Sequence, residues 1–128
     1  MRGILLNILI CDDEDLIRKS LARAFKAIGH QVFEAENGDV GLKLFTTEKI
    51  DLVVLDLLMP EKNGFDFLNE MKSLAPVIII SAFSGHQQGH FHTEEYPQVI
   101  AFVHKPFEHL QTITQQMLEL YENYIRKV

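Results

Sequence analysis

Apolar residues along the chain switch repeatedly between two spacings. Five short segments have the character of strands, and most of them are almost continuously apolar, as expected of strands buried on both faces of a parallel sheet. These segments are residues 5–11, 31–36, 50–56, 76–82 and 99–104. Between most of them, apolar residues recur every three or four positions, which predicts amphipathic helices. The alternation favours a parallel sheet covered by helices on both sides.

Turn-forming residues bound the predicted helices. The first helix ends at Gly29 and carries an apolar stripe made of Ile17, Leu21, Ala24, Phe25 and Ile28. A second, weaker helix follows the Asn37-Gly38 turn, and a third is predicted over residues 64–72. The last helix is the longest, and its predicted core stripe consists of Leu110, Ile113, Met117, Leu120 and Tyr124.

The segment from Ser84 to Gln98 is the part of the chain without a clean period. Inside a helix, Gly85 and Gly89 would each cost about 1 kcal/mol relative to alanine, and Pro97 would end a helix near that point. We therefore expect a fourth helix that is short, mobile or displaced.

Three histidines and a lone cysteine are further candidate sites. His86, His90 and His92 could bind a transition metal, but no paired carboxylate or cysteine completes a set, so solvated loop histidines are favoured. Cys11 cannot form an internal disulfide, because it is the single cysteine of the chain. Its setting favours a buried strand end over a reactive thiol and fits a reducing cytoplasm.

Size and charge narrow the class of protein. The 128 residues are 47% hydrophobic and 23% charged, which fits one globular domain over 1–128 with a core of about 7–126 and no second domain. The formal net charge of −6 disfavours direct binding to nucleic acid or to an anionic membrane. The apolar residues 4–10 are too few to span a bilayer, so we expect a core strand and no leader segment.

Polar residues stand where the predicted strands end. Asp12 and Asp13 follow the first strand, Asp56 ends the third, Ser81 the fourth, and Lys105 follows the fifth. Carboxyl ends of parallel strands share one edge of a sheet, which is where such folds place their working groups. Clustered carboxylates repel one another unless a cation neutralises them, and an all-oxygen site suits Mg²⁺.

Each of these residues also has a simpler interpretation. Asp12 and Asp13 could only cap the first helix, and Asp56 could only form a turn. Ser81 could be a small residue at a strand end, and Lys105 could be solvated. The combination of the five carries the prediction of a site.

Four motifs in a fixed order resemble those of the receiver domains of two-component response regulators. They are "ILICDDE", "DLVVLDLLMPEKNGFDFL", "PVIIISA" and "FVHKPF". The resemblance implies a flavodoxin-like (βα)5 three-layer α/β sandwich, with a five-stranded parallel sheet in the order 2-1-3-4-5. It also implies a signalling phosphoacceptor that catalyses its own phosphotransfer and dephosphorylation, rather than an enzyme acting on a separate substrate.

The resemblance assigns a role to each site residue. Asp56 would accept the phosphoryl group, and Mg²⁺ would be bound by Asp13, by Asp56 and by the backbone carbonyl of Leu58. Asp12 would reach the metal through water, and Lys105 would offset charge on the phosphoryl oxygens. A switch would follow, in which Ser81 donates a hydrogen bond to the phosphoryl group and the aromatic ring of Phe102 moves behind it. An ordinary core position for Phe102 is equally compatible with the sequence.

The expected donor is a sensor histidine kinase or a phosphotransfer protein, and the output is an unknown downstream protein. The domain would be a monomer or a phosphorylation-dependent homodimer. Two other functions stay open at this point. One is a receiver-like interaction module that is no longer phosphorylated. The other is a phosphatase of the haloacid dehalogenase type, which would require a second carboxylate where the chain has Leu58.

Overall fold

Five parallel strands form one sheet at the centre of the computed structural model, which describes residues 4–82 and 95–127. The strands are β1 (Asn7–Cys11), β2 (Gln31–Ala35), β3 (Leu52–Asp56), β4 (Val77–Ser81) and β5 (Val99–His104). Their order across the sheet is β2-β1-β3-β4-β5, and every adjacent pair is parallel. The predicted fold and strand order are therefore confirmed.

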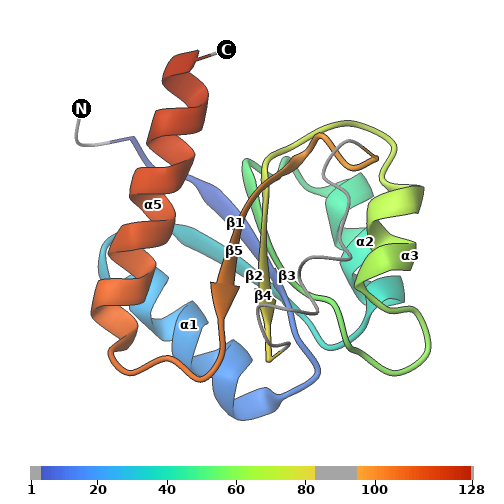
Figure 1. Ribbon diagram of the computed structural model, residues 1–128, viewed down its shortest axis with the longest axis horizontal. Helices are drawn as coiled ribbons and strands as arrows, with labels where there is room; N and C mark the ends of the chain where they lie inside the picture. Colours follow the sequence, from blue (N-terminus) through green and yellow to red (C-terminus); the bar gives the residue numbers. More distant parts are fainter. Residues whose placement is uncertain (1–3, 83–94, 128) are drawn as a thin grey trace.

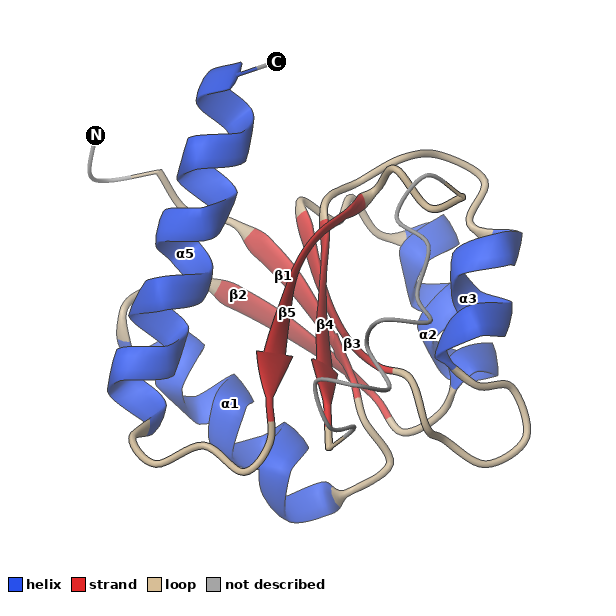
Figure 2. Cartoon of the chain, in the orientation of Figure 1, coloured by secondary structure: helices blue, strands red, loops and turns tan. Residues whose placement is uncertain are grey.

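Within residues 4–82 and 95–127, two helices cover each face of the sheet (Figures 1 and 2). One layer contains α1 (Asp15–Ala27) and α5 (Leu110–Lys127), and the other contains α2 (Gly38–Thr47) and α3 (Gly64–Glu70). Among the described residues, no helix is both long and apolar enough to cross a bilayer.

Alternation along the buried strands divides the core between the two layers. In β1, Ile8 and Ile10 face α1 and α5 and pack with Phe25 and Met117, whereas Leu9 belongs to the cluster on the opposite face. All residues of β3 and β4 are buried. A strand that is covered on both faces needs apolar side chains at successive positions, which explains the continuous apolar runs in the sequence.

Several predicted boundaries differ from the structure. The third helix ends at Glu70 rather than at residue 72, because Met71 has φ −59° and ψ 130° and leaves the helical conformation. Leu5 and Ile28, which we expected in a core strand and in a core stripe, are 65% and 45% exposed. The predicted fourth helix and its three histidines fall mainly within residues 83–94, which lie outside the described residues.

Candidate functional site

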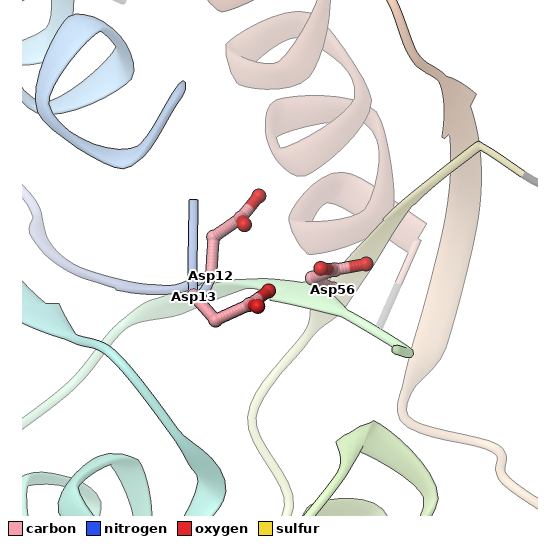
Figure 3. Close-up of side chains that lie close together, drawn as sticks. All are labelled: Asp12, Asp13 and Asp56. Carbon is pink, nitrogen blue, oxygen red and sulfur yellow. The ribbon is translucent and has the colours of Figure 1, made fainter. Parts of the chain in front are cut away.

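Three carboxylates meet where β1 and β3 end side by side. Asp12 and Asp13 follow β1, and Asp56 is the last residue of β3. Oxygen atoms from all three side chains lie within 4.8 Å of one another (Figure 3). Asp12 is fully buried and Asp56 is 4% exposed, whereas Asp13 lies at the surface. The predicted acidic cluster therefore forms, with one side open to solvent.

The ammonium group of Lys105 reaches this cluster from the end of β5. Its Nζ lies 2.8 Å from Oδ2 of Asp12, 2.7 Å from Oε1 of Glu14 and 3.4 Å from Oδ2 of Asp56. The side chain of Lys105 is only 7% exposed, so its ion pairs with the buried Asp12 and Asp56 are largely shielded from water, whereas its pair with Glu14 lies at the surface. Lys105 is thus shared among carboxylates from two strand ends and the start of a helix.

Burial and mutual repulsion perturb the ionisation of the acids. Burial, followed by the charge of Asp12, raises the pKa of Asp56 to about 7. Burial also raises the pKa of Asp12 above its ordinary value, against the opposing effect of Lys105. For Lys105 itself, burial favours the neutral form, but its contacts with Asp12 and Glu14 outweigh burial and raise its pKa. The lysine stays charged, and this one ammonium group faces the carboxyl groups of Asp12, Glu14 and Asp56.

The donor set fits a hard divalent cation. Oδ2 of Asp12 is buried and, among the described residues, accepts no hydrogen bond, because its contact with Lys105 is an ion pair outside hydrogen-bond geometry. A buried carboxylate oxygen without a hydrogen bond, next to two further carboxylates, is the environment in which a second cation beside Lys105 is stabilising. Oxygen ligands with an open side suit Mg²⁺, which retains several of its waters. Asp12, Asp13 and Asp56 could hold such an ion.

The loop after Asp56 brings the start of α3 close to the end of β3. Asn63 caps α3 through a reciprocal hydrogen-bond pair with Asp66, and the N–H of Gly64 donates to the carbonyl of Leu57 at 3.0 Å. A Cβ on Gly64 would lie 2.6 Å from the carbonyl oxygen of Asp56, so a side chain there would push α3 away. Glycine therefore allows the helix to begin directly behind the end of β3.

Ser81 and Leu58 also lie beside the cluster. Ser81 is 1% exposed at the end of β4, next to β3, and its carbonyl accepts a hydrogen bond from the N–H of Lys105 at 2.8 Å. The N–H of Leu58 donates to Oδ1 of Asp56 at 3.3 Å, and the Leu58 side chain is 56% exposed. Phe102 is partly buried on β5 against the cluster on the α2 and α3 face. The structure brings the predicted residues to one region, and their individual roles stay predictions.

Arg18 is a component of the site region that the sequence argument missed. This arginine of α1 is 6% exposed, and its guanidinium donates to the carbonyl of Asp12 at 2.9 Å, to Glu34 at 3.1 Å and to Asp15 at 2.6 Å. It joins the end of β1 to β2 and fixes the start of the acidic turn. A signal was present, because Arg18 stands three residues before Leu21 on the inward face of the helix.

Glu14 is the second residue whose part was missed. The sequence places it beside the acidic pair, but its contact with Lys105 joins residues 91 positions apart. Hydrophobic periodicity gives no information on such a pair, because it indicates which face of an element is buried and not which side chains meet across loops.

The sequence model of the family described as "Response regulator receiver domain" matches residues 8–118. This match covers most of the chain. The chain belongs to the response regulator receiver domain family. It is a receiver domain of a two-component system, and the haloacid dehalogenase alternative is discarded.

Curated relatives resemble the receiver domain over part of their length. This chain is 42% identical over 80 residues to the KDP operon transcriptional regulatory protein KdpE of Escherichia coli, and the match covers 61% of this chain and 36% of that protein. It is 34% identical over 104 residues to the transcriptional regulatory protein PdtaR of Mycobacterium tuberculosis, covering 79% and 50%. The chain thus spans about a third to a half of the length of these relatives.

Solved receiver structures share the whole fold. The response regulator TrrA of Thermotoga maritima, solved in complex with Mg²⁺ and BeF, is 28% identical with a TM-score of 0.76, and the match covers 91% of this chain and 99% of that one. A CheY-like receiver domain protein of Methanospirillum hungatei gives a TM-score of 0.82 at 20% identity, covering 98% and 100%. The second similarity concerns the fold alone.

Proposed function

We propose that Asp56 is the phosphoryl acceptor of this receiver domain and that it is modified with Mg²⁺ bound at the acidic cluster. The observation that carries the proposal is the meeting of three carboxylates within 4.8 Å, with Lys105 in contact with two of them. The position of Asp56 at the end of a strand, beside the solvent-exposed Asp13, supports its role as acceptor, because a donor can approach from that side. The TrrA complex with Mg²⁺ and BeF adds support from a relative.

The chemistry is an in-line displacement at phosphorus. A carboxylate oxygen of Asp56 forms a bond to the phosphorus atom, and the bond from phosphorus to the donor breaks, with its electron pair leaving on the donor. Mg²⁺ would supply charge neutralisation at the phosphoryl oxygens when bound. Asp13, Asp56 and the carbonyl of Leu58 would hold it directly, and Asp12 would reach it through water.

Lys105 and Ser81 would act on the charge that the phosphoryl group introduces. The Lys105 ammonium, held beside Asp56, offsets negative charge on the transferred oxygens. The hydroxyl of Ser81, at the neighbouring strand end, would donate a hydrogen bond to one of those oxygens. Movement of Phe102 on β5 would then pass the change to the surface around β5 and α5, where a downstream protein binds.

The partners follow from the chemistry proposed for Asp56. The phosphoryl group would come from a sensor histidine kinase or a phosphotransfer protein, and the domain would be a monomer or a homodimer that forms on phosphorylation. The formal charge of −6 argues against nucleic-acid binding by this domain. Location in the cytoplasm is part of the proposal, in line with the buried, unpaired Cys11.

Intact-mass spectrometry after treatment with acetyl phosphate and Mg²⁺ tests the acceptor. We expect a gain of one phosphoryl group in the parent protein and none in Asp56→Asn, because an amide does not provide the nucleophilic carboxylate. The matched control is Asp51→Asn, a change just before the opposite end of the same strand, where the side chain accepts a hydrogen bond from Asn7 at 2.8 Å. This variant should still be modified.

Two results would reject the proposal. An unchanged mass in the parent, with donor and Mg²⁺ in excess, would favour an interaction module that is no longer phosphorylated. Modification of Asp56→Asn to the same extent as the parent would place the acceptor on another residue.

A further inference from the structure

Lys105 lies nearer to Glu14 than to the proposed acceptor. The distance from Nζ to Oε1 of Glu14 is 2.7 Å, whereas the distance to Oδ2 of Asp56 is 3.4 Å. The remaining partner, Asp12, is 2.8 Å away. The ammonium is thus drawn toward the start of α1, and its weakest contact is the one with Asp56.

The start of a helix does not explain the position of the Glu14 carboxylate. Glu14 is the N-cap residue of α1, but its side chain accepts no capping hydrogen bond from the helix. Its N–H instead donates to Oδ1 of Asp12 at 2.9 Å, and its carboxylate turns to Lys105. The Glu14 carboxylate therefore binds the Lys105 ammonium and does not cap the helix.

The two closest partners of Lys105 differ in how easily they can release it. The Glu14 side chain is 57% exposed, so water can replace the ammonium at little cost when the ion pair opens. Asp12 is fully buried, and loss of the lysine would leave its charge uncompensated. Of these two carboxylates, Glu14 is therefore the one that Lys105 can leave for another anionic partner.

We propose that Glu14 is a positioning residue that holds Lys105 back from Asp56 until a phosphoryl group arrives. The inference rests on the proposed function of Asp56. The incoming group carries up to two negative charges at neutral pH, which compete with Glu14 for the ammonium. Lys105 then exchanges its contact with Glu14 for one with a phosphoryl oxygen, while Asp12 keeps its own contact. Glu14 thereby lowers the affinity of the pocket for the phosphoryl group.

Beryllofluoride binding with saturating Mg²⁺, followed by backbone amide NMR signals, measures this competition. Glu14→Gln should lower the half-maximal beryllofluoride concentration by roughly two- to fivefold, the range of an exposed ion pair. Glu14→Asp keeps the charge and should return most of the way to the parent value. The control Glu36→Gln removes the same charge from an exposed residue just after β2 and should stay within about 1.5-fold of the parent.

The ammonium signal of Lys105 gives a readout that a structural role for Glu14 would not move. In the parent with Mg²⁺, this ¹⁵N signal should shift when beryllofluoride is added. In Glu14→Gln it should lie partly toward the bound position before any addition, because the competing carboxylate is absent. In Glu36→Gln it should match the parent.

Each outcome separates this inference from the acceptor proposal. If the parent binds beryllofluoride but Glu14→Gln binds it equally or more weakly, the role of Glu14 is wrong and Asp56 keeps its own. An equal gain in Glu36→Gln, or an unshifted Lys105 signal in Glu14→Gln, also overturns it. If the parent neither binds beryllofluoride nor gains a phosphoryl group, both proposals fail.

Discussion

Replacing Asp56 by asparagine should stabilise the metal-free protein at neutral and alkaline pH. The pKa of Asp56 is about 7 in the fold, against an ordinary value of 3.8. Because the folded state binds this proton more tightly than the unfolded state, stability falls as pH rises from about 4 to about 7 and levels off above. At roughly 1.4 kcal/mol per pH unit, the loss reaches roughly 4 kcal/mol. Asp56→Asn removes the ionisation and with it this loss.

Urea unfolding followed by circular dichroism, in EDTA between pH 4.5 and 8.5, measures the effect. At pH 4.5 the variant should be more stable than the parent by only about 1 kcal/mol. At pH 8 the variant should be more stable by about 3–4 kcal/mol, a large fraction of the 5–15 kcal/mol typical of a domain. Mg²⁺ should raise the stability of the parent at pH 8 and have a much smaller effect on Asp56→Asn.

A matched carboxylate isolates the cause. Glu36→Gln removes an exposed acid just after β2 and should change stability by less than about 0.5 kcal/mol at every pH. The reasoning is refuted if the difference between Asp56→Asn and the parent stays constant across the pH range, or if the variant is the less stable protein at pH 8.

Two further predictions concern residues outside the acidic cluster. Arg18→Met should lower the free energy of unfolding in urea by about 2–4 kcal/mol, because it removes the hydrogen-bond donor of Glu34 and of the buried carbonyl of Asp12. The control Lys19→Met changes an exposed residue and should lower it by less than about 0.5 kcal/mol. Equal losses in the two variants would contradict this prediction. His30 accepts a hydrogen bond from the N–H of Leu6 through Nδ1, and burial lowers its pKa, so the unfolded chain protonates first and stability falls below about pH 6.5. His30→Asn should resist this fall, so the stability difference between variant and parent in thermal unfolding should move in favour of the variant between pH 7.5 and 5.5, and a constant difference would count against it.

The strands and their order were predictable because burial on both faces demands apolar residues at successive positions. β4, with Val77 to Ile80 fully buried, is the clearest case. Helix positions followed from spacing, but the exposure of Ile28 did not, since it stands just past the end of α1, where the chain leaves the helix. Pattern predicts which elements pack together more reliably than where each one stops.

The site was predictable to the level of its residues and not of its contacts. The carboxyl ends of adjacent parallel strands must share an edge, so Asp12, Asp56 and Lys105 could be grouped from topology. The preference of the Lys105 ammonium for Glu14 over Asp56 is seen only in two distances, 2.7 Å from Nζ to Oε1 of Glu14 and 3.4 Å from Nζ to Oδ2 of Asp56. Such a difference arises from packing around the lysine, which the linear order of residues does not contain.

The place of Lys105 in the chain has a consequence for folding. The acids come from the first and third strands, but the lysine follows the fifth, so the pocket gains this cation only when the last strand has joined β4. Before that step, a partly folded sheet would bring Asp12 and Asp56 together with no ammonium between them, which opposes early closure of that edge. The assembly of this cluster therefore depends on the completion of the sheet, and a chain whose β5 is poorly docked would lose the contacts of Lys105 while most of its core is still intact.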